Sequence, residues 1–521
     1  MKRRRFLETA LQAAGAFAFA PAVLRQSAAR PLIAYGTACG DITGPRGILW
    51  NRRAGGRGIV WSRTDRPARM LVEWATSDSF QNVHRMAGSI ARDATGFTAR
   101  ADIPDLPAGQ RIFYRVQFED LADSRNLSLP STGSFLSAPD APRDVLFAWS
   151  ADTVGQGWGI NPEFGGLRIY ETMRRAKPDF FIHCGDTIYA DSTLASEVKL
   201  PDGTTWKNIV TPAKSKVAET LDEFRGNHLY NLLDDNVRRF NAEVPQIALW
   251  DDHEVRNNWY PQQILDDDRY TEKSVAVLSR RARQAFLEHV PIRIGPGDTP
   301  HIYRSFPYGR LLDVFALDLR TYRGPNSPNR QSRPSATAAL AGAAQIDWLK
   351  HALAASAAAW KVIASDLPLG VIVPDGDTNF EAFANGDGPP LGRELEVADL
   401  LRFIKQRAIK NVIWVTADVH YAAAHRYDPE RARFKDFRPF WEFVAGPLHA
   451  ATGSVDAMDD TFGPEIKFLG VPRDLKSYPG PPAGMQFFGT VRIAAATQTM
   501  TVRLHNLKGD TIYTVDLPPA D

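Results

Sequence analysis

The chain has 521 residues, which is enough for two or three domains. Hydrophobic residues make up 44% of it and charged residues 23%, an ordinary composition for a globular protein. The 62 basic and 60 acidic residues nearly cancel, so neither a nucleic-acid-binding nor a membrane-binding surface is expected. The sequence contains no coiled-coil heptads, and we expect a monomer.

The first 29 residues are expected to form a signal peptide. The basic segment Lys2–Leu7 precedes an uncharged run from Thr9 to Leu24, and Ser27–Ala29 offers small residues for cleavage. Adjacent arginines followed by Phe and Leu are typical of twin-arginine export signals. A basic amphipathic helix is the alternative interpretation. No later segment approaches 18 apolar residues, so we expect no transmembrane anchor and predict export by the twin-arginine machinery to the periplasm or the medium.

The chain contains two cysteines, Cys39 and Cys184. An exported protein reaches an oxidising compartment, where a disulfide between them can form. Cys184 lies in a predicted strand and Cys39 lies far upstream, which favours two buried free thiols.

Residues 30–141 are predicted to form a β-sandwich of the fibronectin-III or immunoglobulin type. Short segments of alternating apolar and polar residues, separated by turns, indicate strands rather than helices. The clearest ones are GRGIVWSR (56–63), ARMLVEWAT (68–76), FTARADI (97–103) and RIFYRVQFED (111–120). They contain no cluster of titratable residues, so we expect the sandwich to pack against the second domain or to cover part of its site. Binding of a carbohydrate or a protein partner is the alternative.

Residues 142–521 alternate strands with helices after a linker at Ser137–Pro142. Apolar residues at helical spacing predict helices at 167–175, 216–233, 345–353 and 395–404. Apolar runs predict strands at 145–149, 179–183, 312–317, 361–365, 412–416 and 441–444. Three more strands close the chain, with Lys508–Asp510 as a turn. The pattern predicts an α/β (α+β) fold, in which a layered αββα core is followed by an antiparallel β finish.

Acidic and histidine side chains follow four of the predicted strands, at the point where each apolar run ends. Asp152 follows VLFAWS, Asp186 follows DFFIHC, Asp251–Glu254 follow QIALW, and Asp418 and His420 follow NVIWVTA. Open α/β sheets bind ligands at the carboxyl ends of their strands. Oxygen and imidazole donors without cysteine favour a hard or borderline metal pair. The four strand ends therefore predict a two-metal hydrolase site.

A two-metal site needs one carboxylate that bridges the ions and further ligands on each ion. Asp186 is the expected bridge, because Gly185 before it lets the backbone come close. A lone Gly-Asp is often only a turn, but the adjacent carboxylates at Asp251–Glu254 repel each other unless a cation compensates them. The expected metal ligands at the strand ends are Asp152, Asp186, Asp252, Asp418 and His420.

Residues beside these ligands are candidates for the remaining chemistry. His253 is expected to act as a general acid or to stabilise the transition state, because imidazole titrates near neutrality. Tyr189 can reach a metal or a phosphate, and Arg256 either clamps phosphate or pairs with a neighbouring acid. Structural roles are expected for His183, His425 and His449.

Seven segments together resemble the PhoD-like alkaline phosphatases, a family within the calcineurin-like metallophosphoesterases. They are GDTIYAD (185–191), KVAETLDEFR (216–225), WDDHEVRNN (250–258), LDLRTYR (317–323), ANGDGPPLGRELE (384–396), TADVHYAAAHRY (416–427) and WEFVAGPLHA (441–450). The resemblance spans essentially the whole mature chain, and WDDHE together with GD-x-x-Y-x-D is its most specific part. It implies that residues 142–521 form a catalytic domain with metallophosphoesterase-type layers.

The resemblance implies an exported hydrolase of phosphate monoesters and diesters, with iron and calcium as cofactors. The family often has a cysteine ligand shortly after the first catalytic-domain strand, where the nearest ligand type in this chain is Asp152. That departure makes Mn, Zn or Mg alternatives to iron and calcium. The resemblance implies metal-site roles for Asp186, Tyr189, Asp252 and Asp418, catalytic or metal-contacting roles for His253 and His420, and an amide ligand from Asn257.

We therefore expect an enzyme that releases phosphate from its esters through a metal-bound hydroxide. The chain has no Gly-x-Ser-x-Gly motif that would suggest a covalent serine intermediate. A phosphodiesterase of the phospholipase D or teichoic-acid-degrading type is the alternative, and exposed apolar residues at the pocket mouth would mark a lipid substrate. A non-catalytic protein that binds the cell envelope is the remaining alternative, although the intact set of ligand-type residues argues against it.

Overall fold

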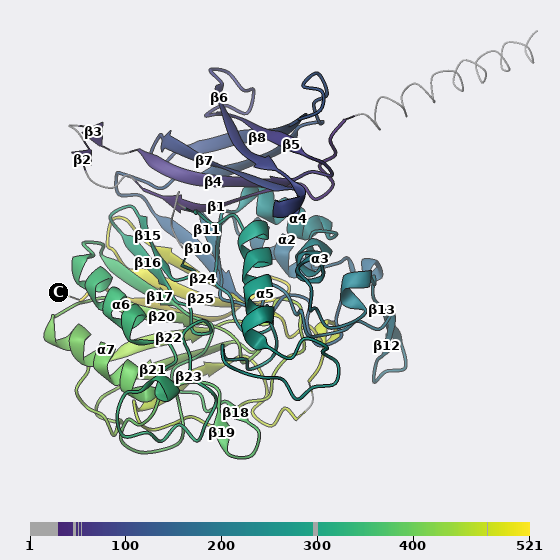
Figure 1. Cartoon of the computed structure of the whole chain (residues 1–521). Helices are drawn as coiled ribbons and strands as arrows, with labels where there is room; N and C mark the ends of the chain where they lie inside the picture. Colours follow the sequence, from purple (N-terminus) through teal and green to yellow (C-terminus); the bar gives the residue numbers. More distant parts are fainter. Residues whose placement is uncertain are drawn as a thin grey trace, which may run out of the picture.

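Two large β-sheets lie against each other in the structure, with helices on their outer faces and a smaller β-sandwich at one end (Figure 1). The computed structural model describes residues 30–44, 48–49, 52–53, 55–294, 301–476 and 478–520. The expected signal peptide, residues 1–29, lies outside the described residues and stays a prediction.

The N-terminal strands form the two sheets of a sandwich. One sheet has the order β6-β5-β8-β9, and β1, β4 and β7 lie side by side in the other. Buried and partly exposed residues alternate along β8, as a strand with one face in the core requires. The four strands predicted from the clearest segments are confirmed: β4 (Gly56–Arg63), β5 (Ala68–Ala75), β7 (Thr98–Leu106) and β8 (Arg111–Asp120). The other strands of this part of the chain are β1 (Thr37–Thr43), β6 (His84–Ala91), β9 (Ser131–Leu136) and the short pair β2 (Ile48–Leu49) and β3 (Arg52–Arg53).

The sandwich and the layers that follow it share a sheet, which the sequence did not suggest. Gly40 of β1 pairs in parallel with Gln246 of β14 (Gln246–Ala248). One nine-stranded sheet therefore runs in the order β26-β25-β24-β10-β11-β14-β1-β4-β7. Backbone hydrogen bonds thus continue across the boundary predicted at residues 141–142, which stays a prediction about domains.

The two large sheets enclose the main hydrophobic core. Phe147 and Ile182 of the nine-stranded sheet pack in one buried cluster with Val362 and Val415 of the seven-stranded sheet. The nine-stranded sheet also contains β10 (Val145–Ser150), β11 (Phe180–His183), β24 (Phe487–Ile493), β25 (Met500–Asn506) and β26 (Thr511–Leu517). The seven-stranded sheet contains β15 (Arg304–Tyr308), β16 (Leu312–Ala316), β17 (Trp360–Ala364), β20 (Val412–Thr416), β22 (Phe440–Val444), β21 (Ala423–Tyr427) and β23 (Pro464–Leu469).

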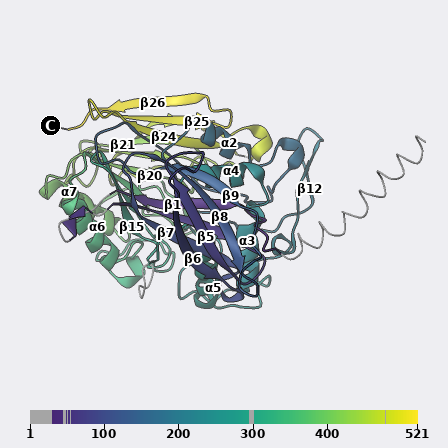
Figure 2. The ribbon, with the colours of Figure 1, turned by 90° about the horizontal axis from the view of Figure 1, so that it is seen from above.

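Helices cover the outer faces of both sheets, which confirms the αββα layers. Met173 and Phe240 pack on Phe181 on one side, and Leu349 and Leu401 pack with residues of the seven-stranded sheet on the other. Figure 2 shows the sandwich strands from above, with β26 at one side. The helices are α2 (Arg168–Arg175), α3 (Leu221–Asn231), α4 (Asp235–Glu243), α5 (Val275–His289), α6 (Ala343–Ala355) and α7 (Glu394–Gln406).

Three helical segments differ from the sequence-based expectation. The helix predicted at 216–233 begins only at Leu221, because Thr220 and Glu223 form a capping box that starts it there. Helices α4 and α5 were not predicted.

Among the described residues, no helix is long and apolar enough to cross a membrane. Cys39 and Cys184 are both buried and free, which confirms the expectation of two thiols.

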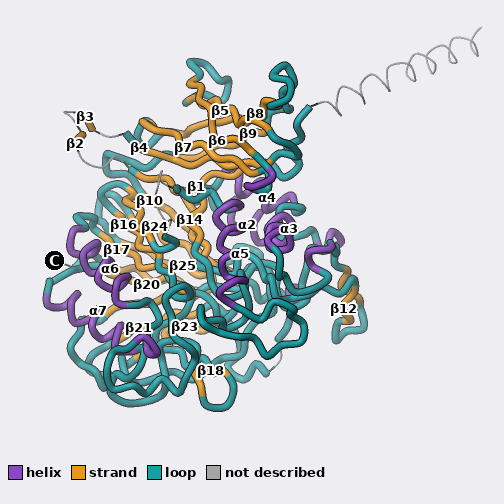
Figure 3. The backbone as a smooth tube through the Cα atoms, viewed as in Figure 1, coloured by secondary structure: helices purple, strands orange, loops and turns teal. Residues whose placement is uncertain are grey.

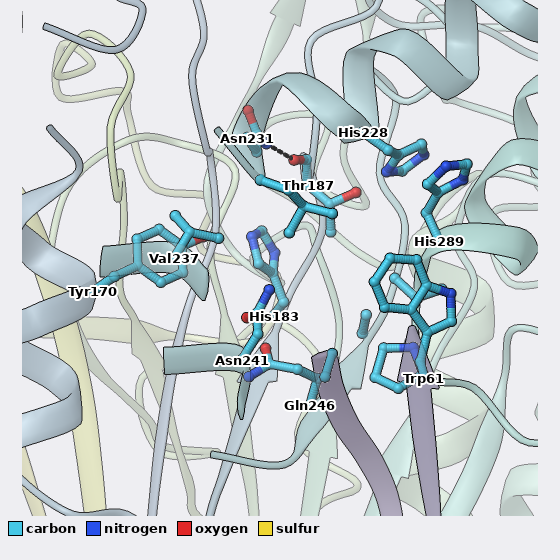
Figure 4. Close-up of a pocket in the computed structure, with 15 residues that line it drawn as sticks. Trp61, Tyr170, His183, Thr187, His228, Asn231, Val237, Asn241, Gln246 and His289 are labelled. Atoms are coloured by element: carbon cyan, nitrogen blue, oxygen red, sulfur yellow. Dashed lines mark hydrogen bonds between the residues drawn. The ribbon is translucent and has the colours of Figure 1, made fainter. Parts of the chain in front are cut away.

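A small cavity of about 80 Å³ lies where β1 and β4 of the sandwich meet α3, α5 and β14 (Figure 4). Three buried histidines, His183, His228 and His289, line it, and each has a ring nitrogen without a hydrogen-bond partner among the described residues. The rings of His228 and His289 stack with centroids 5.3 Å apart. Burial lowers the pKa of His183 and of His289 to about 3 and holds that of His228 well below 6.5. These imidazoles are therefore neutral in the folded protein.

Loops dominate the end of the molecule opposite the sandwich, where β18 lies (Figure 3). Two short hairpins belong to the connecting segments: β12 (Glu197–Lys199) with β13 (Thr205–Lys207), and β18 (Pro374–Asp375) with β19 (Asn379–Phe380). Catalytic and binding residues commonly lie on loops that a rigid sheet core positions.

Candidate metal centre

The acidic and histidine residues at the strand ends come together around one cavity of about 440 Å³. The parallel strands β10, β11 and β14 are adjacent, so the residues after them meet at one sheet edge. Strand β20 brings Asp418 and His420 from the second sheet. The residues lining the cavity are Gln156, Asp186, Asp252, His253, Asn257, Asn258, Val373, Pro374, Glu381, Asp418, Val419, His420, Gly453, Ser454, Asp456 and Tyr478.

Four of the converging residues have left-handed backbone conformations. The φ angles are 67° at Asp152, 50° at Asp186, 64° at Asp418 and 59° at His420. Non-glycine residues rarely adopt such angles, and those that do cluster at functional sites. Gly185 also has a positive φ, and a Cβ there would lie 2.4 Å from the Cβ of Asp251. The backbone therefore comes as close at Gly185 as the sequence suggested.

Asp152, Asp186 and His420 form the first group that can hold a cation. One ligand atom from each lies within 4.8 Å of the others, and all three residues are buried. Both carboxylate oxygens of Asp152 are buried and lack a hydrogen-bond partner among the described residues. Burial raises the pKa of Asp152 well above its ordinary value, as it does for Asp186. A buried carboxylate without partners is costly, and a cation beside it removes that cost.

The hydrogen bond of Nδ1 directs Nε2 of His420 toward this group. Its Nδ1 donates to the carbonyl of Ala451, so Nε2 carries the lone pair in the neutral ring. Nε2 lies 3.6 Å from Asp152 Oδ1 and 2.9 Å from the Tyr189 hydroxyl. Burial lowers the pKa of His420 to about 4, which keeps the imidazole neutral, as a metal ligand must be.

Asp186, Asp252 and His253 form a second group, again with ligand atoms within 4.8 Å of one another. Asp186 belongs to both groups, which is the arrangement expected of a bridging carboxylate. One Asp186 oxygen accepts from the backbone amide of His253 at 3.1 Å, and one Asp252 oxygen accepts from that of Asn258 at 2.6 Å. The donor set of carboxylate oxygens and imidazole fits hard or borderline cations.

His253 is held by Asp191, a partner that sequence reasoning missed. Nδ1 of His253 lies 2.7 Å from Asp191 Oδ1, and the other Asp191 oxygen accepts from the amide of Asn257 at 2.9 Å. The ring of Tyr189 stacks on His253 with centroids 4.2 Å apart. Burial opposes protonation, but Asp191, Asp252 and Asp186 raise the pKa of His253 well above its ordinary value. Asp191 ends the GD-x-x-Y-x-D pattern, and that spacing was the available signal.

Arg320, which sequence reasoning also missed, lies fully buried behind the cavity. The Nε of Arg320 lies 2.7 Å from Asp251 Oδ1 and 3.1 Å from Asp366 Oδ2. The other guanidinium nitrogens form ion pairs with Glu381 and with Asp418, whose Oδ1 lies 3.5 Å from Nη2. One guanidinium thus offsets part of a cluster of buried acids. Its position in LDLRTYR was noted in the sequence, but nothing in that segment distinguishes a buried arginine from an exposed one.

The structure does not bring every candidate to the cavity. Asn257 lines it, whereas Arg256 does not, and the Nε of Arg256 is buried without a hydrogen-bond partner among the described residues. Tyr189 and Asp152 do not line the cavity themselves but lie against residues that do. Tyr189 contacts His253 and His420, and Asp152 has a ligand atom within 4.8 Å of those of Asp186 and His420. The histidines expected to be structural are buried away from it: His183 against Thr153, His425 against Glu442, and His449 against Gly159.

Comparisons with known proteins show the family of the chain. The family model of the PhoD-like phosphatases matches residues 147–504, and that of their N-terminal domain matches residues 18–139. The chain is 28% identical over 449 residues to alkaline phosphatase D of Bacillus subtilis, covering 82% of this chain and 71% of that protein.

Solved structures give the same result for the fold. A structure of PhoD has a TM-score of 0.67 and 19% identity, covering 94% of this chain and 92% of that one. The purple acid phosphatase PPD1 of yellow lupin (Lupinus luteus) seeds has a TM-score of 0.53 and 12% identity, with 92% and 74% covered. The chain therefore belongs to the PhoD-like phosphatase family and is a hydrolase of phosphoric ester bonds.

Proposed function

We propose that the protein is an exported, two-metal phosphoesterase that releases phosphate from monoesters, diesters or both. The observation that carries the proposal is the buried Asp152, whose two oxygens have no hydrogen-bond partner among the described residues and lie beside Asp186, a carboxylate shared by two ligand groups. The basic, alanine-rich start of the chain supports export by the twin-arginine machinery to the periplasm or the medium.

Two cations would be held in adjacent positions. Asp152, Asp186 and His420 would hold one, because their ligand atoms lie within 4.8 Å of one another, and the Tyr189 hydroxyl, 2.9 Å from His420 Nε2, would be a further ligand. Asp186, Asp252 and the side chain of Asn257 would hold the other, with Asp418 available from the second sheet. The family resemblance favours iron and calcium. The oxygen ligand Asp152, where the family often has cysteine, equally suits Mn, Zn or Mg.

Bound cations of this kind acidify a water molecule and neutralise the charge on phosphoryl oxygens. The protein's own groups supply the rest. Asp191 accepts from Nδ1–H of His253, which orients the ring so that Nε2 points toward Asp252 at 3.9 Å. His253 lines the cavity, and its partner Asp191 favours the protonated ring, so His253 can donate from Nε2 to the departing alkoxide.

Turnover after metal reconstitution tests the proposal. The purified protein is stripped with chelator and then supplied separately with Fe and Ca, Mn, Zn or Mg. Hydrolysis of 4-nitrophenyl phosphate and bis(4-nitrophenyl) phosphate is measured. We expect turnover with at least one of these additions and a loss of about a thousandfold or more in Asp186→Asn, which removes the shared ligand. Full turnover by the stripped protein, or by Asp186→Asn, contradicts the proposal.

A further inference from the structure

Apart from the protonated His253, the cavity has no cationic side chain among the described residues to receive a phosphate. None of the described residues that line it is lysine or arginine, whereas five of them are carboxylates: Asp186, Asp252, Glu381, Asp418 and Asp456. Metal-site and charge-pairing roles account for four of these acids. Asp186 and Asp252 belong to the metal groups, and Glu381 and Asp418 pair with Arg320.

Asp456 is the carboxylate that remains. Within the described part of the chain, its side chain makes no hydrogen bond or ion pair, although it is only partly exposed. Burial raises its pKa to about 6, so it is ionised at alkaline pH. Asp456 is therefore the one acid of the lining that belongs to neither ligand group and has no ion-pair partner among the described residues.

The segment that carries Asp456 is fixed at both ends. The amide of Gly453 donates to the carbonyl of His420 at 2.9 Å, and the amide of Ile372 donates to the carbonyl of Ala457 at 2.9 Å. Met458 forms a further bridge with Val371. These backbone bonds tie the segment to the strand-end residue His420 and to the 371–373 loop. The carboxylate is thus held at a defined place on the wall.

Tyr478 lines the same cavity, and 64% of its surface is exposed. Together with Asp456, Ser454 and Val373, it belongs to loops of the second half of the chain, whereas the metal ligands come from strand ends. Because these loops form the wall beside the strand ends, a phosphate bound there would have its alcohol group next to them. An aromatic face and a carboxylate both attract a positively charged group.

We propose that Asp456 determines substrate specificity by charge, so that the site favours phosphate esters whose alcohol carries a positive charge and disfavours those whose alcohol carries a second negative charge. The inference rests on the proposed phosphoesterase function and names the class of ester that the same site takes. Asp456 is a specificity residue and not a catalytic one, because it contacts the alcohol group rather than the reacting phosphorus.

Three esters of similar size test the proposal at pH 8.5: 2-aminoethyl phosphate, 2-hydroxyethyl phosphate and carboxymethyl phosphate, each also as its methyl diester. Two charges about 6 Å apart at a wet protein surface change kcat/KM by about tenfold. We expect the metal-loaded wild-type protein to prefer the ammonium ester over the carboxylate ester by about a hundredfold. In Asp456→Asn the ratio should fall to within a few fold of one, mainly through KM.

A matched variant and a neutral probe complete the experiment. Asp377→Asn makes the same change on the exposed tip of the β18–β19 hairpin, outside the cavity lining, and should keep the wild-type ratio. Turnover of 4-nitrophenyl phosphate by Asp456→Asn shows that the variant is folded and loaded. If that turnover is retained but the charge ratio is unchanged, the inference is overturned alone. If no ester is hydrolysed by the wild-type protein with any metal, the proposed function is overturned and the inference falls with it.

Discussion

Replacing Asp152 with asparagine should have opposite effects on stability with and without metal. In the metal-free protein, Asp152 is a buried carboxylate whose oxygens lack hydrogen-bond partners, and it lies near Asp186. An unpaired buried polar group costs about 1–3 kcal/mol and a charged one costs more. Asparagine has the same shape without the charge, so the metal-free variant should gain about 1–2 kcal/mol over the wild-type protein.

Metal should reverse that order. A ligand at a hundred times its Kd stabilises the folded state by about 2.7 kcal/mol. Loss of one charged ligand that weakens binding tenfold to a hundredfold removes about 1.4–2.7 kcal/mol of that gain. Thermal unfolding followed by circular dichroism, with chelator and with saturating metal, measures both effects. Asp78→Asn, an exposed change on the sandwich, should leave both curves unchanged.

The reasoning fails in one clear case. If Asp152→Asn is less stable than the wild-type protein in chelator, and if metal stabilises both proteins equally, then Asp152 is not a cation ligand. The missing hydrogen-bond partners of its oxygens would then have no connection with metal binding.

The other predictions concern His253, the proposed general acid, the buried Arg320 and the cavity lined by His183, His228 and His289. His253→Gln should reduce kcat by about 10²–10⁴ for alkyl phosphates and much less for 4-nitrophenyl phosphate, because a good leaving group needs no proton. Equal losses of kcat on both kinds of ester would contradict a general-acid role. Arg320→Met should destabilise the protein by about 3–5 kcal/mol by leaving buried acids unpaired, and an unchanged urea midpoint would refute that. His183, His228 and His289 have pKa values in the folded protein that lie below the ordinary 6.5. The unfolded chain therefore binds more protons than the folded protein at acidic pH. The free energy of unfolding should fall as pH drops from about 6.5 toward 3, by up to about 1.4 kcal/mol per pH unit for each histidine. Urea unfolding at pH 7.5 and pH 5.0 measures this, and equal stability at both values would contradict it.

The strand-end residues show what the sequence was able to predict. Asp152, Asp186, Asp252 and Asp418 each follow an apolar run, and adjacent parallel strands then bring their ends together. That argument needs only local periodicity and the rule for sheet edges. It therefore located the cavity and the layers without any knowledge of how the sheets pack.

The parts that were missed depend on burial and on long-range contacts. Nothing in the sequence distinguishes Arg320 from a surface arginine. Only the fold brings Asp251, Asp366 and Glu381 around its guanidinium group. The contact between β1 and β14 joins residues about 200 positions apart, and no local pattern announces it. Arg256 is the opposite case, because its place after Asp252 suggested either a phosphate contact or an ion pair, and it does not line the cavity.

Metal content measured together with turnover tests the central claim most directly. The full chain is produced with its own N-terminal segment and purified, and its metals are determined by elemental analysis. Hydrolysis of a monoester and a diester is then followed before and after chelation. The account predicts about two metal ions per chain, with turnover that is lost on chelation and restored when the same metals are returned. A protein without bound metal that hydrolyses no ester under any supplementation, or one whose turnover survives complete metal removal, would contradict it.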